Sequence, residues 1–364
     1  MHNNVLLIAI AAGAPAMALA SGFTIDRIAS DQPGVAKLTD PNMVNAWGLI
    51  ASGTSPWWIG ANGSGTSLVY NGATENKIGL TVAIPGDGSV TGVAFNGNSA
   101  AFNGDAFLFG SEDGTVSGWR GALGTTAETL QLGSASNVYK GVTDAVIAGD
   151  SYAYLANFRA GGIDVMKGTG AAPNLSGTFT DPSLPAGYAP FNVMQLGGVL
   201  YVTYAVQDPT KHDDVAGAGN GIVDAYDLNG NLIQRLVTGG HLDSPWGLAL
   251  APAGFAGFGG DLLVGNFGDG TINAYNPATG AYQGTLQDAG GNPLTIDGLW
   301  GLGFGNGANA GSANRLYFTA GPEGESHGLF GALDPVPEPR TWIMTLMAAG
   351  MLWSIRRAAV SRRM

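Results

Sequence analysis

The residues of this chain that could do chemistry carry side-chain oxygens and follow short apolar runs. Asn157 follows Tyr-Ala-Tyr-Leu-Ala, and Asn266 follows Asp-Leu-Leu-Val-Gly. Amide and carboxylate oxygens are the ligands that hard cations such as Ca²⁺ prefer. If the apolar runs are equivalent strands of a repeat, side chains at their ends meet on one face. The candidates at this position are Asn62, Ser111–Asp113, Asn157, Asp208, Asn266 and Glu323.

The same residues have a simpler interpretation, because Asn and Asp near glycine commonly form turns and bond the local backbone. Lys211–Asp214 adds a histidine and two carboxylates within a glycine-rich insertion, residues 207–221, but the spacing is not that of an EF-hand. We therefore predict either a Ca²⁺ site built from Asn62, Asn157, Asp208 and Asn266, or turn formers at these positions. We favour the turn formers, and a solvated acidic loop at 211–214. The cofactor stays open, with Ca²⁺ as the candidate.

Six repeats must position these side chains. Their opening strands are centred near residues 48, 92, 141, 191, 247 and 301, a period of about 50 residues that suits a four-stranded blade. Glycine-bounded second and third strands follow in each unit, and a fourth is predicted in five of them, as at Leu232–Val237. The fold class predicted is all-β, a six-bladed β-propeller of four-stranded blades. A seven-bladed propeller and a right-handed β-helix are the alternatives.

The sixth repeat has no fourth strand of its own, which would leave an open sheet edge. Phe23–Ile28 alternates apolar and polar residues in the same way as Leu232–Val237. We therefore predict that this N-terminal strand completes the sixth blade and closes the ring.

Tryptophan recurs at one position of the repeat, as Trp47, Trp246 and Trp300. This recurrence favours packing between blades over a platform on which sugars stack. The adjacent pair Trp57-Trp58 should alternate in direction along a strand, which predicts that at least one of the two is exposed.

Composition excludes several classes of function. The chain has no cysteine, so disulfides and thiolate metal sites are excluded. When Glu338 and the five arginines that follow it in the sequence are left out, residues 21–334 keep ten basic and 26 acidic residues, a formal charge of −16. Such a domain should repel nucleic acid. No nucleophile elbow precedes a helix, and no glycine-rich loop has the context needed to cradle phosphate.

Both ends of the chain look like targeting segments. Residues 1–20 combine an apolar core at 5–12 with Ala18-Leu19-Ala20, as in a cleavable signal peptide. Residues 335–364 contain Pro337-Glu338-Pro339, then an apolar run at 341–355 that predicts a transmembrane helix, and then a basic tail. The arginines of this tail are Arg356, Arg357, Arg362 and Arg363.

This C-terminal sequence of a Pro-Glu-Pro motif, an apolar run and a basic tail resembles the PEP-CTERM sorting signal of Gram-negative bacteria. The resemblance implies an exosortase-type processing enzyme as a partner and a transient hold on the inner membrane through the C-terminal helix. It also implies export across the inner membrane, with the domain of residues 21–334 in the cell envelope, at the cell surface or in the extracellular matrix.

The middle of the chain resembles a family of uncharacterised bacterial six-bladed propellers that is distantly similar to NHL-repeat proteins. The resemblance lies in Asn157–Val165, Asp213–Gly221 and Ser244–Ala249. It implies fold and exported location. The function expected is that of a non-catalytic scaffold or binding protein for an extracellular polysaccharide or an envelope protein. The alternative is a metal-dependent hydrolase that uses the central face, as lactonase-type and gluconolactonase-type propellers do.

Overall fold

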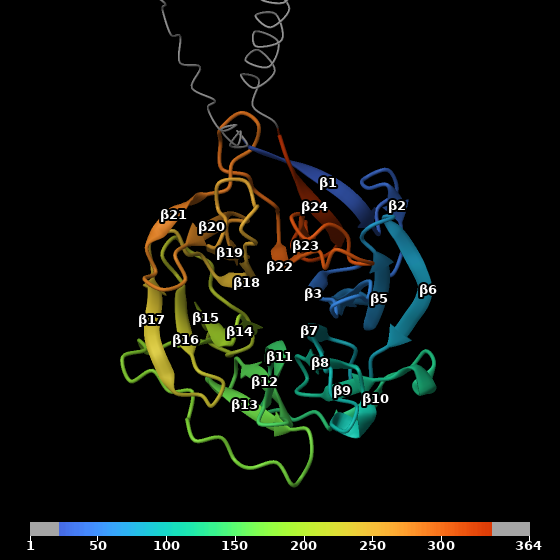
Figure 1. Ribbon diagram of the computed structural model, residues 1–364, viewed down its shortest axis with the longest axis vertical. Helices are drawn as coiled ribbons and strands as arrows, with labels where there is room; N and C mark the ends of the chain where they lie inside the picture. Colours follow the sequence, from blue (N-terminus) through green and yellow to red (C-terminus); the bar gives the residue numbers. More distant parts are fainter. Residues whose placement is uncertain (1–21, 337–364) are drawn as a thin grey trace, which may run out of the picture.

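The computed structural model describes residues 22–336, which form six β-sheets arranged as blades around one axis (Figure 1). The six-bladed propeller is confirmed, and neither seven blades nor a β-helix is present in this part of the chain. Among residues 22–336, no helix is both long enough and apolar enough to cross a membrane. The predicted signal peptide, the Pro-Glu-Pro motif, the transmembrane helix and the basic tail lie outside the described residues.

In each blade, successive strands lie progressively farther from the central axis. Blade 1 contains β3 (Ala46–Ile50), β4 (Trp57–Ala61), β5 (Thr66–Asn71) and β6 (Asn76–Ala83). Blade 2 contains β7 (Val90–Phe95), β8 (Phe107–Ser111), β9 (Val116–Trp119) and β10 (Glu128–Gln131). Blade 3 contains β11 (Tyr139–Ile147), β12 (Asp150–Asn157) and β13 (Gly162–Lys167). Blade 4 contains β14 (Tyr188–Leu196), β15 (Val199–Val206), β16 (Ile222–Tyr226) and β17 (Leu232–Thr238).

The last two blades complete the ring. Blade 5 contains β18 (Pro245–Leu250), β19 (Leu262–Asn266), β20 (Ile272–Tyr275) and β21 (Tyr282–Thr285). Blade 6 contains β22 (Leu299–Phe304), β23 (Leu316–Ala320), β24 (Leu329–Pro335) and β1 (Phe23–Ser30), with the short β2 (Leu38–Thr39) beside β1. Three single-turn 3₁₀ helices lie in loops: η1 (Asn62–Ser64), η2 (Phe102–Gly104) and η3 (Gly121–Leu123).

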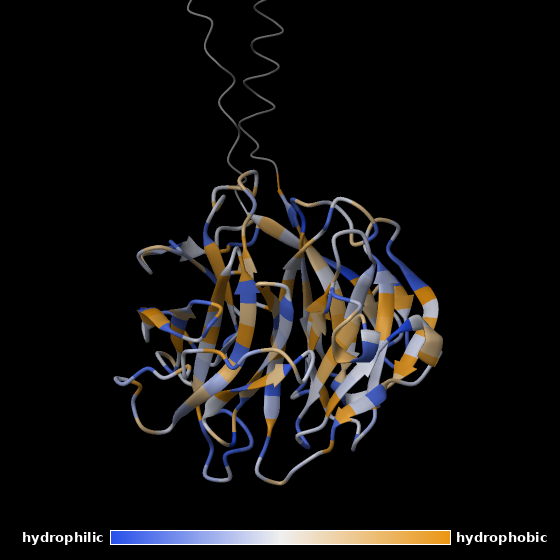
Figure 2. Cartoon of the chain, turned by 60° about the horizontal axis from the view of Figure 1, so that its bottom comes forward, coloured by the Kyte–Doolittle hydropathy of each residue, from blue (hydrophilic) through white to orange (hydrophobic). Residues whose placement is uncertain are grey.

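Glycine on the innermost strands lets neighbouring blades approach closely. A Cβ at Gly48 would lie 2.5 Å from the carbonyl oxygen of Thr91 on the next blade. A Cβ at Gly247 would lie 2.6 Å from the carbonyl oxygen of Trp300. The repeated Trp-Gly pair therefore joins a large central side chain to a residue that permits contact between backbones. Figure 2 shows the apolar residues concentrated along the strands, with mostly hydrophilic or neutral loops between them.

The ring closes as predicted. β1 pairs antiparallel with β24, with Phe23 opposite Pro335 and Ser30 opposite Leu329. Arg315, the residue before β23, forms ion pairs with Asp26 of β1 and with Asp334 of β24. The backbone N–H of Val336 donates to the carbonyl oxygen of Gly22 over 2.9 Å. The folded unit therefore extends two residues beyond the predicted boundary at 334.

Blade 3 corrects the prediction of a fourth strand in five repeats. Its sheet has three strands, and β13 is the outermost. The chain that follows leaves the sheet and bonds to blade 4, because Gly177 N–H donates to Asn229 O over 2.9 Å and Phe179 N–H donates to Gly230 O over 3.0 Å. The ring of Phe179 then packs against Tyr154 and Tyr226.

The expectation that Trp57 or Trp58 is exposed is wrong. Their exposed fractions are 2% and 4%. Trp57 packs on Tyr317 of blade 6, whereas Trp58 stacks on Phe107 of blade 2 at 4.0 Å. Alternation along β4 does turn the two rings to opposite faces, but each face of a propeller blade is covered by a neighbouring blade.

Candidate functional site

The centre of the propeller is filled by aromatic rings from several blades. Trp47 and Trp300 stack with centroids 3.8 Å apart, and Trp246 meets both rings edge-on. Phe267 stacks on Trp300 at 3.9 Å. The three tryptophans are each no more than 2% exposed, which confirms their packing role and rules out a sugar-stacking platform at these positions.

Lys140 lies in this central layer. It precedes Gly141 on β11, as Trp47 precedes Gly48 and Trp300 precedes Gly301 on the equivalent strands. Its ammonium group lies 5.1 Å from the centroid of the Trp47 ring, a cation–π distance. Trp246 Nε1–H donates to the backbone oxygen of Lys140 over 2.9 Å.

Two carboxylates from neighbouring blades hold the Lys140 ammonium. Glu112, which follows β8, forms one ion pair, and Asp213, in the long loop after β15, forms the other with Nζ and Oδ1 3.1 Å apart. The Lys140 side chain is only 2% exposed. Burial acts to lower the pKa of Lys140, but the two carboxylates outweigh it and raise the pKa, so the ammonium stays protonated.

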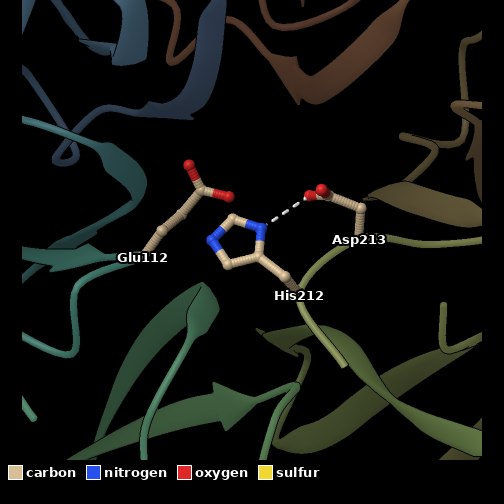
Figure 3. A group of neighbouring side chains, drawn as sticks. All are labelled: Glu112, His212 and Asp213. Atoms are coloured by element: carbon tan, nitrogen blue, oxygen red, sulfur yellow. Dashed lines mark hydrogen bonds and ion pairs between the residues drawn. The ribbon is translucent and has the colours of Figure 1, made fainter. Parts of the chain in front are cut away.

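The same carboxylates face His212. The ligand atoms of Glu112, His212 and Asp213 lie within 4.8 Å of one another, as a metal site would require. Figure 3 shows the imidazole between the two carboxylates, with His212 Nδ1 2.9 Å from Asp213 Oδ1. In this group one nitrogen and two oxygens could serve as ligands, but the Lys140 ammonium already binds both carboxylates.

A layer of amides and one further carboxyl group extends this cluster toward blades 1 and 6. Asn62 Nδ2–H donates to Glu112 Oε2 over 3.0 Å, and Asn45 Nδ2–H donates to Glu325 Oε2 over 2.7 Å. Asn45 Oδ1 accepts hydrogen bonds from the indole N–H groups of Trp47 and Trp300. Burial raises the pKa of Glu325. We call Asn45, Asn62, Glu112, Lys140, His212, Asp213 and Glu325 the central polar cluster.

The structure brings only one of the four predicted metal residues into the central polar cluster. Asn62 belongs to it, whereas the other three bond locally. Asn157 Oδ1 accepts from the backbone N–H groups of Val138 and Ala160. Asn266 Nδ2 donates to the backbone oxygen of His241 over 2.8 Å.

Asp208 shapes the long loop after β15. Its Oδ1 accepts the backbone N–H of His212 over 2.8 Å, and its Oδ2 accepts the hydroxyl of Thr210 over 2.6 Å. The Thr210 hydrogen bond is the main reason that its pKa falls to about 2. Asp208 and Asn157 thus accept backbone N–H groups as turn formers do. Asn266 does not, because its Oδ1 is buried and has no hydrogen-bond partner among the described residues. Metal binding at all three residues stays a prediction.

Glu323, another residue that the sequence placed at the ends of the second strands, is exposed and lies near His327, outside the central polar cluster. The residues that sequence reasoning missed are Lys140, Asn45 and Glu325. Lys140 carries a detectable signal, because a lysine stands at the repeat position that holds tryptophan in three other blades. No comparable signal marks Glu325, which reaches the cluster from a loop.

Comparisons with known proteins identify relatives across most of the chain. No family model matches. Uncharacterized protein R648 of Acanthamoeba polyphaga mimivirus is 32% identical over 331 residues, covering 85% of this chain and 80% of the relative. Uncharacterized protein L690 of the same virus is 28% identical over 333 residues, covering 85% of each chain.

Solved structures of similar fold include two enzymes. The PQQ-bound aldose sugar dehydrogenase of Streptomyces coelicolor has 12% identity and a TM-score of 0.48, covering 87% of this chain and all of the other. A streptogramin B lyase structure has 13% identity and a TM-score of 0.47, covering 86% of this chain and 98% of the other. No activity follows from similarity at this distance.

Proposed function

We propose that this chain, which belongs to the same family as mimivirus protein R648, is a non-catalytic binding propeller, exported and sorted through its C-terminal segment. The proposal has two parts. The first concerns what the central face does, and the second concerns where the protein goes.

The single observation that carries the first part is the Lys140 ammonium between Glu112 and Asp213. A divalent cation that bound Glu112 and Asp213 would have to displace the Lys140 ammonium, which is buried and covalently tethered to the chain. A general base there would have to work from a carboxylate already neutralised by an ion pair. The aromatic layer packs beneath the cluster, and the exposed side chains of His212 and Asp213 form its solvent side. We therefore assign the central polar cluster a structural role and assign binding to other surfaces.

The second part rests on the sequence at the two ends. Residues 1–20 supply export, and Pro337-Glu338-Pro339 with the apolar run at 341–355 supplies the site at which an exosortase-type enzyme acts. The partners proposed after processing are an extracellular polysaccharide or an envelope protein. The relatives reported above are viral, so the bacterial setting rests on the C-terminal motif alone.

A metal-dependent hydrolase is the second candidate, and one observation favours it. Glu112, His212 and Asp213 hold their ligand atoms within 4.8 Å of one another. If the Lys140 ammonium withdrew, these three groups could hold a divalent ion.

Metal analysis of purified residues 22–336, which contain all six blades and both strands of the closure, separates the two candidates. We expect less than about 0.1 divalent ion per chain after gel filtration, and a melting temperature that neither EDTA nor millimolar Ca²⁺ changes. Stoichiometric metal, lost with a fall in melting temperature on EDTA treatment, would favour the hydrolase.

A further inference from the structure

Blade 3 is the one blade among residues 22–336 whose third strand has no fourth strand beside it. In blades 4 and 5 the third strands are wholly buried, at all five residues of β16 and all four of β20. No residue of β13 is buried, and Val165 at its middle is 36% exposed. Its outer backbone groups pair with no other strand of the described chain.

The edge of β13 borders a slot with two walls, each of which lines a cavity. One wall comes from the end of blade 2, where Gln131 and Leu132 help to line a cavity of about 410 Å³ on one face of β13. The other wall is residues 174–179, which line a cavity of about 240 Å³ on the opposite face. The second wall is fixed to blade 4 by the hydrogen bonds of Gly177 and Phe179.

Side chains of β13 alternate between the two cavities as a strand requires. Asp164 and Met166 line the first cavity, Ile163 and Lys167 line the second, and Val165 borders both. We propose that this slot binds an extended peptide of a partner protein, which adds to β13 as the fourth strand of blade 3. The inference deepens the proposed binding function and rests on it.

The two cavities indicate which peptide fits. The first holds the Asp164 carboxylate, which accepts hydrogen bonds from Tyr139 and Asn157 but has no ion-pair partner among residues 22–336. The second combines the apolar side chains of Ile163, Leu175 and Phe179 with the polar side chains of Lys167, Asn174 and Thr178. A peptide with a basic side chain on one face and apolar side chains on the other is therefore complementary to both cavities.

One of the protein's own fourth strands has a sequence of this character. β17 contains Leu-Ile-Gln-Arg-Leu-Val, and in an extended peptide of this sequence Leu232 and Leu236 lie on one face and Arg235 lies on the other. A second copy of the chain is a poorer occupant, because two domains with a formal charge of −16 each repel one another.

The test uses residues 22–336 and a fluorescein-labelled peptide with the sequence of residues 231–238, Asn-Leu-Ile-Gln-Arg-Leu-Val-Thr. Fluorescence anisotropy should show saturable binding. Val165→Asp should weaken it at least about tenfold, since a charge would then replace the apolar side chain that borders both cavities. The matched control is Ile233→Asp, at an exposed residue of β17, which should change binding less than about twofold. A peptide with Glu in place of Arg should also bind more weakly.

Hydrogen exchange of the unsubstituted protein keeps the test independent of any folding defect. Peptide should slow exchange of the amides in residues 162–167 and leave β17 unchanged. Absence of binding up to about 1 mM peptide, or slowed exchange only in other strands, would overturn the proposal. So would a dimer whose β13 amides are protected without peptide, because a second copy would then fill the slot.

These outcomes are separable from failure of the proposed function. Metal at the central polar cluster would refute a purely binding role and leave the peptide result as it is. A protein that holds no metal and does not bind the peptide would refute the peptide site at β13 and leave the proposed binding function standing.

Discussion

Lys140 occupies in blade 3 the place that Trp300 occupies in blade 6, one residue before the glycine at which neighbouring inner strands meet. One cation thus replaces one aromatic ring in the central layer. Glu112 and Asp213 complement that cation, and Asn62 in turn donates to Glu112. The polar chemistry of the central face follows from this one replacement.

Lys140→Met should turn the central polar cluster into a divalent-cation site. Removing the ammonium leaves the half-buried Glu112 and the exposed Asp213 without their partner, so we expect a loss of about 1–3 kcal/mol in the free energy of unfolding. Millimolar Ca²⁺ should raise the melting temperature of this variant and leave that of the original protein unchanged. Lys37→Met, at an exposed ion pair, is the control and should cost under about 1 kcal/mol. A variant indifferent to Ca²⁺ would refute the idea.

Ile28→Ala should weaken the closure of the ring. Ile28 on β1 is fully buried against blades 6 and 1, so its truncation should cost about 2–4 kcal/mol in chemical denaturation. Thr24→Ala, at an exposed residue of the same strand, should cost less than about 0.5 kcal/mol. Deletion of residues 23–28 should cause aggregation, since it uncovers the edge of β24. An unchanged melting temperature after this deletion would contradict the role of β1.

The pair of His327 and Asp31 should make stability depend on pH. His327 Nδ1 lies 2.7 Å from Asp31 Oδ2, and this hydrogen bond is the main reason that the pKa of His327 is raised above 6.5. The stabilisation is therefore complete below pH 6.5 and is lost as the pH rises through the raised pKa of the folded state. The melting temperature of His327→Gln should fall below that of the original protein more at about pH 5.5 than at about pH 8.5. Asp31→Asn should show the same trend; a constant difference across this range would exclude the pair as its cause.

Glu338→Ala should alter sorting without altering the propeller. The motif lies outside the described residues 22–336, so we expect the melting temperature to stay the same, while unprocessed chain should accumulate in the inner membrane. Cell fractionation with antibodies to both ends of the chain measures this. Glu323→Ala, at an exposed residue of the propeller, is the control. If the mature surface form keeps its C-terminal epitope and Glu338→Ala does not change location, the segment is only an anchor.

The repeat could be predicted because its physical cause is local. Glycine before or after each strand and the alternation of Phe23–Ile28 are visible in the sequence, and they predicted the blades and the closure. The missing fourth strand of blade 3 could not be predicted in this way. Residues 168–187 leave the sheet because Phe179 packs between Tyr154 and Tyr226, a contact that only the folded ring creates.

The central polar cluster was predictable only in pieces. The segments Ser111–Asp113 and Lys211–Asp214 both stand out as polar, but nothing in their spacing shows that Glu112 meets Asp213 through Lys140. The angle between blades decides that contact. The same lack of angular information produced the error at Trp58, whose outward-facing ring is covered by Phe107 of the next blade.

The pairing of β1 with β24 joins the first strand of the described residues to the last. During synthesis β1 is made long before β24, so the ring can be completed only after the sixth blade has been translated. A product that stops before Leu329 cannot close, and it keeps the edge of β1 open to other chains. A closed ring can therefore form only from a chain whose translation has reached the end of the domain.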